Sequence, residues 1–157
     1  MKKVILVYVG LIVAFILLAV LGFGRNLTSF LPFGGNAEAE INGKKVELII
    51  AKTDEDRITG LSGRENLSNN QGMLFIFEEK GKYPFWMKEM KFPIDIIYIN
   101  DDTVVHIVKN AAPPENLGTI PERYIPPEPV NYVLELNAGK VEELNIEKGS
   151  KITFSGL

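Results

Sequence analysis

Six residues suited to binding chemistry lie within or beside apolar stretches of the sequence. They are two arginines, one lysine, two carboxylates and the single tryptophan: Arg57, Arg64, Trp86, Lys88, Asp95 and Glu135. Arginine binds carboxylate or phosphate groups through its planar fork, and tryptophan can stack on a sugar or a cation. If these side chains meet in the folded chain, they predict a pocket for a small polar or anionic ligand.

The same residues allow two other interpretations. An unpaired buried charge is costly, so Arg57 or Arg64 could pair with Asp95 or Glu135 inside a purely structural or scaffolding module. Alternatively, Asp95 and Glu135 could form the general acid and base of a hydrolase. Glycoside hydrolysis, for example, needs two carboxyl groups at a defined separation.

Several other kinds of site are not expected from the composition. The chain has no cysteine and one histidine, His106, which lies among valines and isoleucines as a core or edge histidine would. A transition-metal centre normally needs several such ligands. No phosphate-binding loop or dinucleotide fingerprint occurs. We therefore expect no cofactor and no metal site.

The charge distribution argues against nucleic acid as a partner. Residues 37–157 carry 14 basic and 20 acidic side chains, which gives a formal net charge of −6. An acidic domain is repelled by phosphate backbones and by anionic lipid headgroups.

The N-terminal residues predict a membrane anchor. Residues 4–23 are an uninterrupted apolar run, which as a helix would span about 30 Å, close to the hydrocarbon thickness of a bilayer. A cleaved signal peptide or a buried helix is the alternative, but the nearest cleavage-like pattern begins only at Ala37. Two lysines, Lys2 and Lys3, precede the apolar run, whereas one arginine, Arg25, follows it. This excess of positive charge favours a cytoplasmic N-terminus. We expect residues 1–3 in the cytoplasm, a signal anchor over 4–24, a tether over 25–36 and an extracytoplasmic domain over 37–157.

The domain reads as a series of short strands with one or two short helices. Asn42-Gly43 predicts a hairpin between strands at 37–41 and 45–51. Thr53 and Asp56 predict a helix cap, and Ile58 and Leu61 are expected to face the core. Further strands are expected at 73–77, 85–87, 94–99, 103–109, 131–137 and 151–154, with a charged turn at 78–84 and a helical turn at 139–144. The expected fold is mainly β, a sandwich or partly closed barrel of about eight strands.

Residues 111–130 are unusual because they contain six of the nine prolines. Proline cannot donate to a strand ladder and disfavours helix at the residue before it, so this segment is expected to be a long loop. Loops of this length are usually functional or disordered. We expect an ordered flap across the sheet, or a plain covering for one of its faces.

Several short motifs in this order resemble the family catalogued as domain of unknown function 192. They include Arg57-x-x-Gly60-Leu61-x-x-Arg64, Gly72-Met73-Leu74-Phe75-x-Phe77, Phe85-Trp86-Met87-Lys88, Pro93-x-Asp95-Ile96 and Val133-Leu134-Glu135 followed by Gly139. Glu89 and Ser62 depart from the family pattern. The resemblance covers about residues 46–154 and implies a small, mostly β, secreted or membrane-tethered protein with no assigned activity.

The functional expectation is therefore a membrane-anchored extracytoplasmic binding module. Its partner would be a small polar molecule, a saccharide or a protein of the cell envelope.

Overall fold

The protein is described by a computed structural model that covers residues 37–116 and 121–157. The segments predicted as cytoplasmic N-terminus, membrane anchor and tether lie outside the described residues. In the part of the chain that is described, neither helix is long and apolar enough to cross a membrane.

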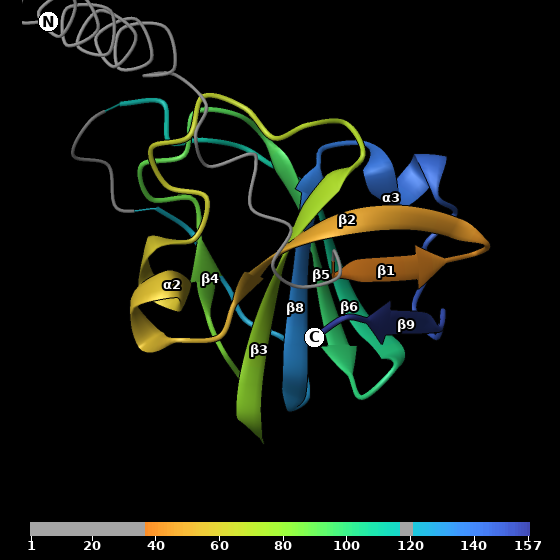
Figure 1. The fold of residues 1–157 in the computed structure, drawn as a ribbon. Helices are drawn as coiled ribbons and strands as arrows, with labels where there is room; N and C mark the ends of the chain where they lie inside the picture. The colour runs from red at the N-terminus through yellow and green to blue at the C-terminus, as the bar shows by residue number, and fades with distance from the viewer. Residues whose placement is uncertain (1–36, 117–120) are drawn as a thin grey trace, which may run out of the picture. The chain divides into compact units, whose positions relative to one another are not determined.

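The described residues form nine strands and two short helices (Figure 1). The strands are β1 (Glu38–Ile41), β2 (Lys44–Ala51), β3 (Gln71–Gly81), β4 (Phe85–Trp86), β5 (Ile94–Asn100), β6 (Thr103–Ala111), β7 (Arg123–Tyr124), β8 (Val130–Asn137) and β9 (Ile152–Ser155). The helices are α2 (Asp54–Thr59) and α3 (Lys140–Glu143).

Seven of the described strands make one sheet in the order β6-β5-β8-β3-β2-β1-β9, and β4 pairs separately with β7. Neighbouring strands of the large sheet are antiparallel, except that β2 and β3 are parallel. A parallel pair cannot be joined by a tight hairpin. Residues 52–70 therefore form a crossover between β2 and β3, and α2 lies in this crossover.

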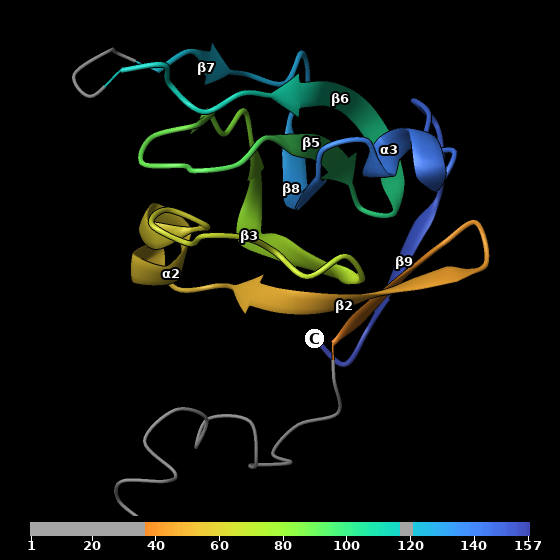
Figure 2. The same ribbon diagram turned by 90° about the horizontal axis from the view of Figure 1, so that it is seen from above.

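The large sheet curls until its two outer strands meet at one end. Thr103, at the start of β6, forms a bridge with Lys151, just before β9. The Val104 amide donates to the Ser150 carbonyl at 2.9 Å, and the Val104 carbonyl accepts from the Gly149 amide at 2.7 Å. The curl is visible from above in Figure 2. The mainly β prediction is confirmed, and the arrangement is a half-barrel rather than a sandwich.

Both faces of the large sheet are apolar, because its central strands carry continuous apolar runs and successive side chains point to opposite faces. One face carries Met73, Phe75 and Ile96, and the other carries Leu74 and Ile97. We call the first the α2 face, since the crossover packs on it, and the second the α3 face. The predicted burial of the 73–77 strand on both sides is confirmed at residues 73–75.

Two local predictions are confirmed in detail. β1 and β2 are joined by the two-residue turn Asn42-Gly43, whose φ angles are 49° and 76°, as a type I′ turn requires. Thr53 caps α2: its side chain accepts from the Asp56 amide, while the Asp56 carboxylate accepts from the Thr53 amide.

Two other local predictions are wrong. Residues 78–81, expected to be part of a turn, continue β3, because the chain beyond Ile76 stays extended and pairs again with β8 at Gly81. Ile58, expected in the core, is 81% exposed. α2 ends at Thr59, so Leu61 reaches the core from the turn that follows the helix while Ile58 faces outward.

The described parts of the proline-rich segment lie over the α2 face, as both the flap and the covering predictions required. β7 pairs with β4, and the Tyr98 hydroxyl on β5 donates to the Tyr124 carbonyl at 2.7 Å. The partly buried Tyr124 side chain packs against the core of the α2 face. The flap is therefore tied to the sheet by a buried tyrosine.

Asp95 is fully buried and joins two elements through backbone amides. Its carboxylate accepts from the amide of Asn110 on β6 and from the amide of Val141 on α3, each at 2.9 Å. Asn110 has a φ of 53°, so the carboxylate stabilises a strained turn of the chain as well as the start of α3. The role of Asp95 is structural.

Asp95→Asn should lower the free energy of unfolding by about 2–4 kcal/mol, because an amide supplies one acceptor where two are used and its NH₂ faces a backbone N–H. Urea unfolding of the variant and of wild type measures this difference. Glu147→Gln, at an exposed acidic position, is the control and should change stability little. Equal stabilities for all three proteins would contradict the assigned role.

Candidate functional site

A cavity of about 370 Å³ opens on the α2 face between α2, the outer part of β3 and residues 83–86. Its wall is mainly apolar and aromatic, with Ile58, Leu61, Phe75, Phe77, Phe85, Trp86 and Met90. Its ionisable lining groups are Asp54, Arg57, Tyr83 and Glu135. A concave, mostly apolar pocket with a few polar groups is typical of a small-molecule site.

Helix α2 forms one side of the cavity without an apolar stripe of its own. None of its described residues is buried, so the helix depends on its cap and on polar contacts. Gly60 ends it with a φ of 50°, which disfavours a side chain. A Cβ at Gly60 would lie 3.3 Å from the Phe75 ring, so the glycine also lets the helix end approach the cavity wall.

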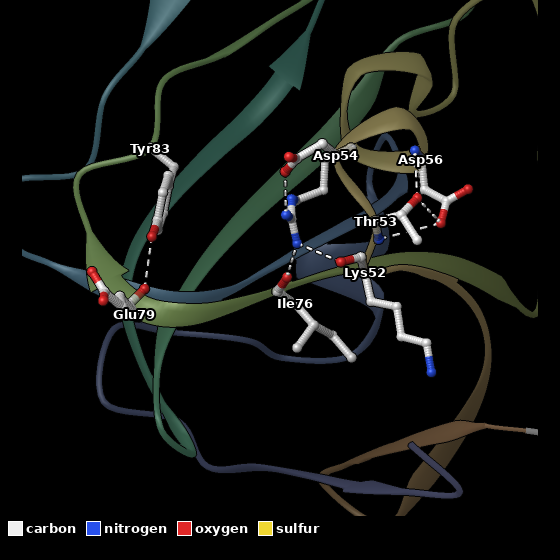
Figure 3. Close-up of polar contacts among 8 residues, drawn as sticks. Lys52, Thr53, Asp54, Asp56, Ile76, Glu79 and Tyr83 are labelled. Atoms are coloured by element: carbon white, nitrogen blue, oxygen red, sulfur yellow. Dashed lines mark hydrogen bonds and ion pairs between the residues drawn. The ribbon is translucent and has the colours of Figure 1, made fainter.

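Arg57 fastens α2 to the sheet. Its guanidinium donates to the carbonyls of Lys52 and Ile76, both at 2.7 Å, and pairs with the Asp54 carboxylate at 2.5 Å. Figure 3 shows these three acceptors converging on one guanidinium. The group also lies 5.3 Å from the centre of the Phe77 ring. Arg57 is therefore engaged by the protein itself and acts as a positioning residue.

The aromatic wall consists of rings that pack on one another. Phe75 and Phe85 meet edge to face with centroids 4.8 Å apart, and Phe77 stacks on Tyr83 at 3.6 Å. The Tyr83 hydroxyl donates to the Glu79 carbonyl at 2.7 Å, which holds this ring over the end of β3 (Figure 3). These mutual contacts make the wall a fixed surface.

Trp86 stands at the mouth of the cavity and is 46% exposed. The Arg123 guanidinium lies 5.3 Å from its ring centre, and the Lys88 ammonium lies 5.9 Å away. Neither cation lines the cavity itself. Both distances are within the range of cation–π attraction, so the ring is held between the flap and the residues that follow β4.

Glu135 lies on β8, lines the cavity and is 5% exposed. Its neighbours across the strands are Met73 and Ile96, which offer no polar group. Burial raises the pKa of Glu135 from its ordinary value of 4.5 to about 8, and no described residue pairs with it to oppose this shift. Burial and the nearby Glu135 also raise the pKa of Tyr98. At neutral pH, Glu135 is mainly a neutral carboxylic acid.

The structure brings together three of the six residues predicted as a ligand site. Arg57, Trp86 and Glu135 line the cavity. The Lys88 ammonium lies 5.9 Å from the centre of the Trp86 ring and does not line the cavity. Arg64 is exposed and also lies outside the lining.

Asp95 lies on the opposite face of the sheet from Glu135. In the pairing of β5 with β8, Asp95 lies opposite Leu136, and Ile96 lies opposite Glu135. Paired residues point to the same side and successive residues to opposite sides, so the two carboxylates point to opposite sides of the sheet. They therefore do not flank a common space, as the hydrolase interpretation requires. The expected ion pairs are also wrong: Arg57 pairs with Asp54, and Asp95 binds backbone amides.

Apart from Trp86, the aromatic wall was missed as part of the site. The available signal was the aromatic residues Phe75, Phe77, Tyr83 and Phe85, which were assigned to the predicted strands at 73–77 and 85–87 and to the predicted turn at 78–84.

Comparison with known proteins places the chain in a family. The model of domain of unknown function 192 (DUF192), described as "Uncharacterized ACR", matches residues 37–154. The chain belongs to the DUF192 family. No curated protein matches the chain significantly.

Two solved structures are similar to the DUF192 domain. A Sinorhizobium meliloti protein, described as a proposed transcription regulator, is 31% identical with a TM-score of 0.69, and the match covers 79% of this chain and 97% of that one. A Novosphingobium aromaticivorans protein of unknown function is 26% identical with a TM-score of 0.65, over 75% of this chain and 83% of that one.

The pKa of Glu135 predicts a pH-dependent stability. Folding favours the protonated form of Glu135, because its pKa is higher in the folded chain than in the unfolded one. Its contribution to the free energy of unfolding is therefore complete below pH 4.5. As pH rises, this contribution falls by about 1.4 kcal/mol per pH unit and is lost by about pH 8. Glu135→Gln keeps the size of the side chain but cannot ionise. The difference in unfolding free energy between wild type and this variant should therefore shift in favour of the variant from about pH 5 to about pH 8, then level off.

Urea unfolding at several pH values measures this difference. The exposed control Glu147→Gln should follow the wild-type curve throughout. Parallel curves for wild type and Glu135→Gln would mean that Glu135 titrates normally in the folded protein.

Proposed function

We propose that the DUF192 domain is a binding module that takes a small organic molecule into the cavity on its α2 face. The observation that carries the proposal is Glu135, an ionisable group without a partner among the described residues, at the aromatic-walled cavity. Ionisable groups with strongly shifted pKa values in clefts are frequent at functional sites. The fixed aromatic wall would hold the body of the ligand, and Glu135 would hold its polar group.

The proposal includes the location expected from the sequence. A signal anchor at residues 4–24 would hold the chain in the membrane with its N-terminus in the cytoplasm, and the domain would bind its ligand on the extracytoplasmic side. The cavity would then lie on the extracytoplasmic side of the membrane, where a saccharide, another small molecule or an envelope protein could reach it.

Two other functions are less well supported. A hydrolase based on Asp95 and Glu135 lacks a shared substrate position, because the two side chains lie on opposite faces. The description of the Sinorhizobium relative would suggest transcription regulation, but the net charge of −6 on residues 37–157 of this chain disfavours contact with nucleic acid.

Leu61→Phe tests ligand binding by adding bulk at the cavity wall, where Leu61 is 2% exposed. The full-length chain is screened by thermal unfolding against sugars, nucleotides, organic acids and amines, with Trp86 fluorescence as a second signal. A ligand at 100 times its Kd should stabilise wild type by about 2.7 kcal/mol, and the variant should lose most of this stabilisation.

Ile125→Phe is the matched control, because Ile125 is 55% exposed and does not line the cavity. The control should keep wild-type binding. A ligand that stabilises wild type and Leu61→Phe equally would place the binding site elsewhere.

A further inference from the structure

We propose, building on the proposed function, that the cavity on the α2 face is selective for small organic amines. The ammonium group would pair with the Glu135 carboxylate, and the apolar body would lie against the aromatic wall. The proposal rests on which charges face Glu135, on the nature of the wall and on the size of the cavity.

The strands beside Glu135 and the segment before β4 offer it no cation. On the adjacent strands, its neighbours are the apolar side chains of Met73 and Ile96. Tyr98 also lies nearby, but its hydroxyl donates to the Tyr124 carbonyl. The segment before β4 contributes Tyr83, whose hydroxyl donates to the Glu79 carbonyl.

Helix α2 adds one positive and one negative group, and these already pair with each other. Arg57 is bound to Asp54 and to two backbone carbonyls, so it adds little positive charge that a ligand could use. With Glu135 ionised, the cavity lining therefore carries a net negative charge. An anionic ligand would find no free cation in the lining, whereas an ammonium group would complete the one missing ion pair.

The wall favours the same class of ligand. Aromatic faces attract cations, and the Arg57 guanidinium over Phe77 shows that this wall already accommodates one. An ammonium–carboxylate contact in a site with little water is a charge-assisted hydrogen bond, stronger than the single neutral bond that an alcohol could make with a protonated acid. The volume of about 370 Å³ lies at the small end of ligand pockets, which favours a small monoamine.

Binding of an amine would release a proton. Free Glu135 is a neutral acid at pH 7, because burial raises its pKa to about 8. The O–H bond breaks when the ammonium enters, the proton leaves to solvent, and the carboxylate–ammonium pair remains. Affinity should therefore rise by about tenfold per pH unit up to about pH 8 and then level off. A neutral ligand would show no such dependence.

The experiment compares amines with alcohols of matched shape: propylamine with 1-propanol, phenethylamine with 2-phenylethanol, and tryptamine with tryptophol. Titration calorimetry of the full-length chain gives affinities, and titration in two buffers of different ionisation enthalpy gives the number of protons released. We expect at least one amine to bind at least tenfold more tightly than its alcohol, with nearly one proton released at about pH 6.5.

Glu135→Gln should weaken amine binding at least tenfold and abolish proton release, while leaving binding of the matched alcohol nearly unchanged. Glu147→Gln, an exposed acid away from the cavity, should behave as wild type. This pattern separates a direct contact with Glu135 from a general change in net charge.

Two outcomes would overturn the inference, and neither coincides with failure of the proposed function. If alcohols bind as tightly as their matched amines, and Leu61→Phe blocks this binding, the domain is a binding module without a preference for amines. Absence of binding by every amine would also exclude this ligand class, while the wider screen with Leu61→Phe and Ile125→Phe separately decides whether the cavity binds another small molecule.

Discussion

The register of β8 between β3 and β5 decides which side of the sheet each polar side chain reaches. Glu135 lies opposite Met73 and Ile96, so its carboxyl group emerges on the α2 face. Asp95, level with Leu136, emerges on the α3 face. A slip of one residue would exchange the faces of every side chain on the strand. Two similar carboxyl groups on neighbouring strands therefore have unrelated roles.

The two carboxyl groups also differ in how their burial is tolerated. Asp95 receives two backbone amides, so its charge is stabilised within the protein. Glu135 lacks such donors among the described residues and remains a neutral acid near pH 7. Proteins commonly keep groups of this kind at sites of function, where a loss of stability is offset by the interaction that the group makes with its ligand. Arg57, which also lines the cavity, binds Asp54 and two backbone carbonyls. Because its guanidinium is occupied in this way, it does not neutralise Glu135.

Local chemistry made much of the fold predictable, and long-range pairing limited the prediction of the site. The Asn42-Gly43 turn and the Thr53 cap depend on residues within a few positions of one another, and both form as expected. The partners of Asp95 lie 15 and 46 residues away, and its acceptors are satisfied by main-chain groups that have no sequence signature. The prediction that Ile58 is buried was wrong for a related reason. An apolar residue in a helix suggests a buried face, yet α2 borders a cavity instead of covering the sheet.

The way in which α2 is attached has a dynamic consequence. The helix has six residues, and its described side chains are not buried, so its position depends on one cap and the Arg57 contacts rather than on hydrophobic packing. Segments with few buried apolar contacts open at free energies well below that of global unfolding. We therefore expect α2 to open at a lower free energy than the half-barrel unfolds, and such opening would give molecules transient passage past one side of the cavity.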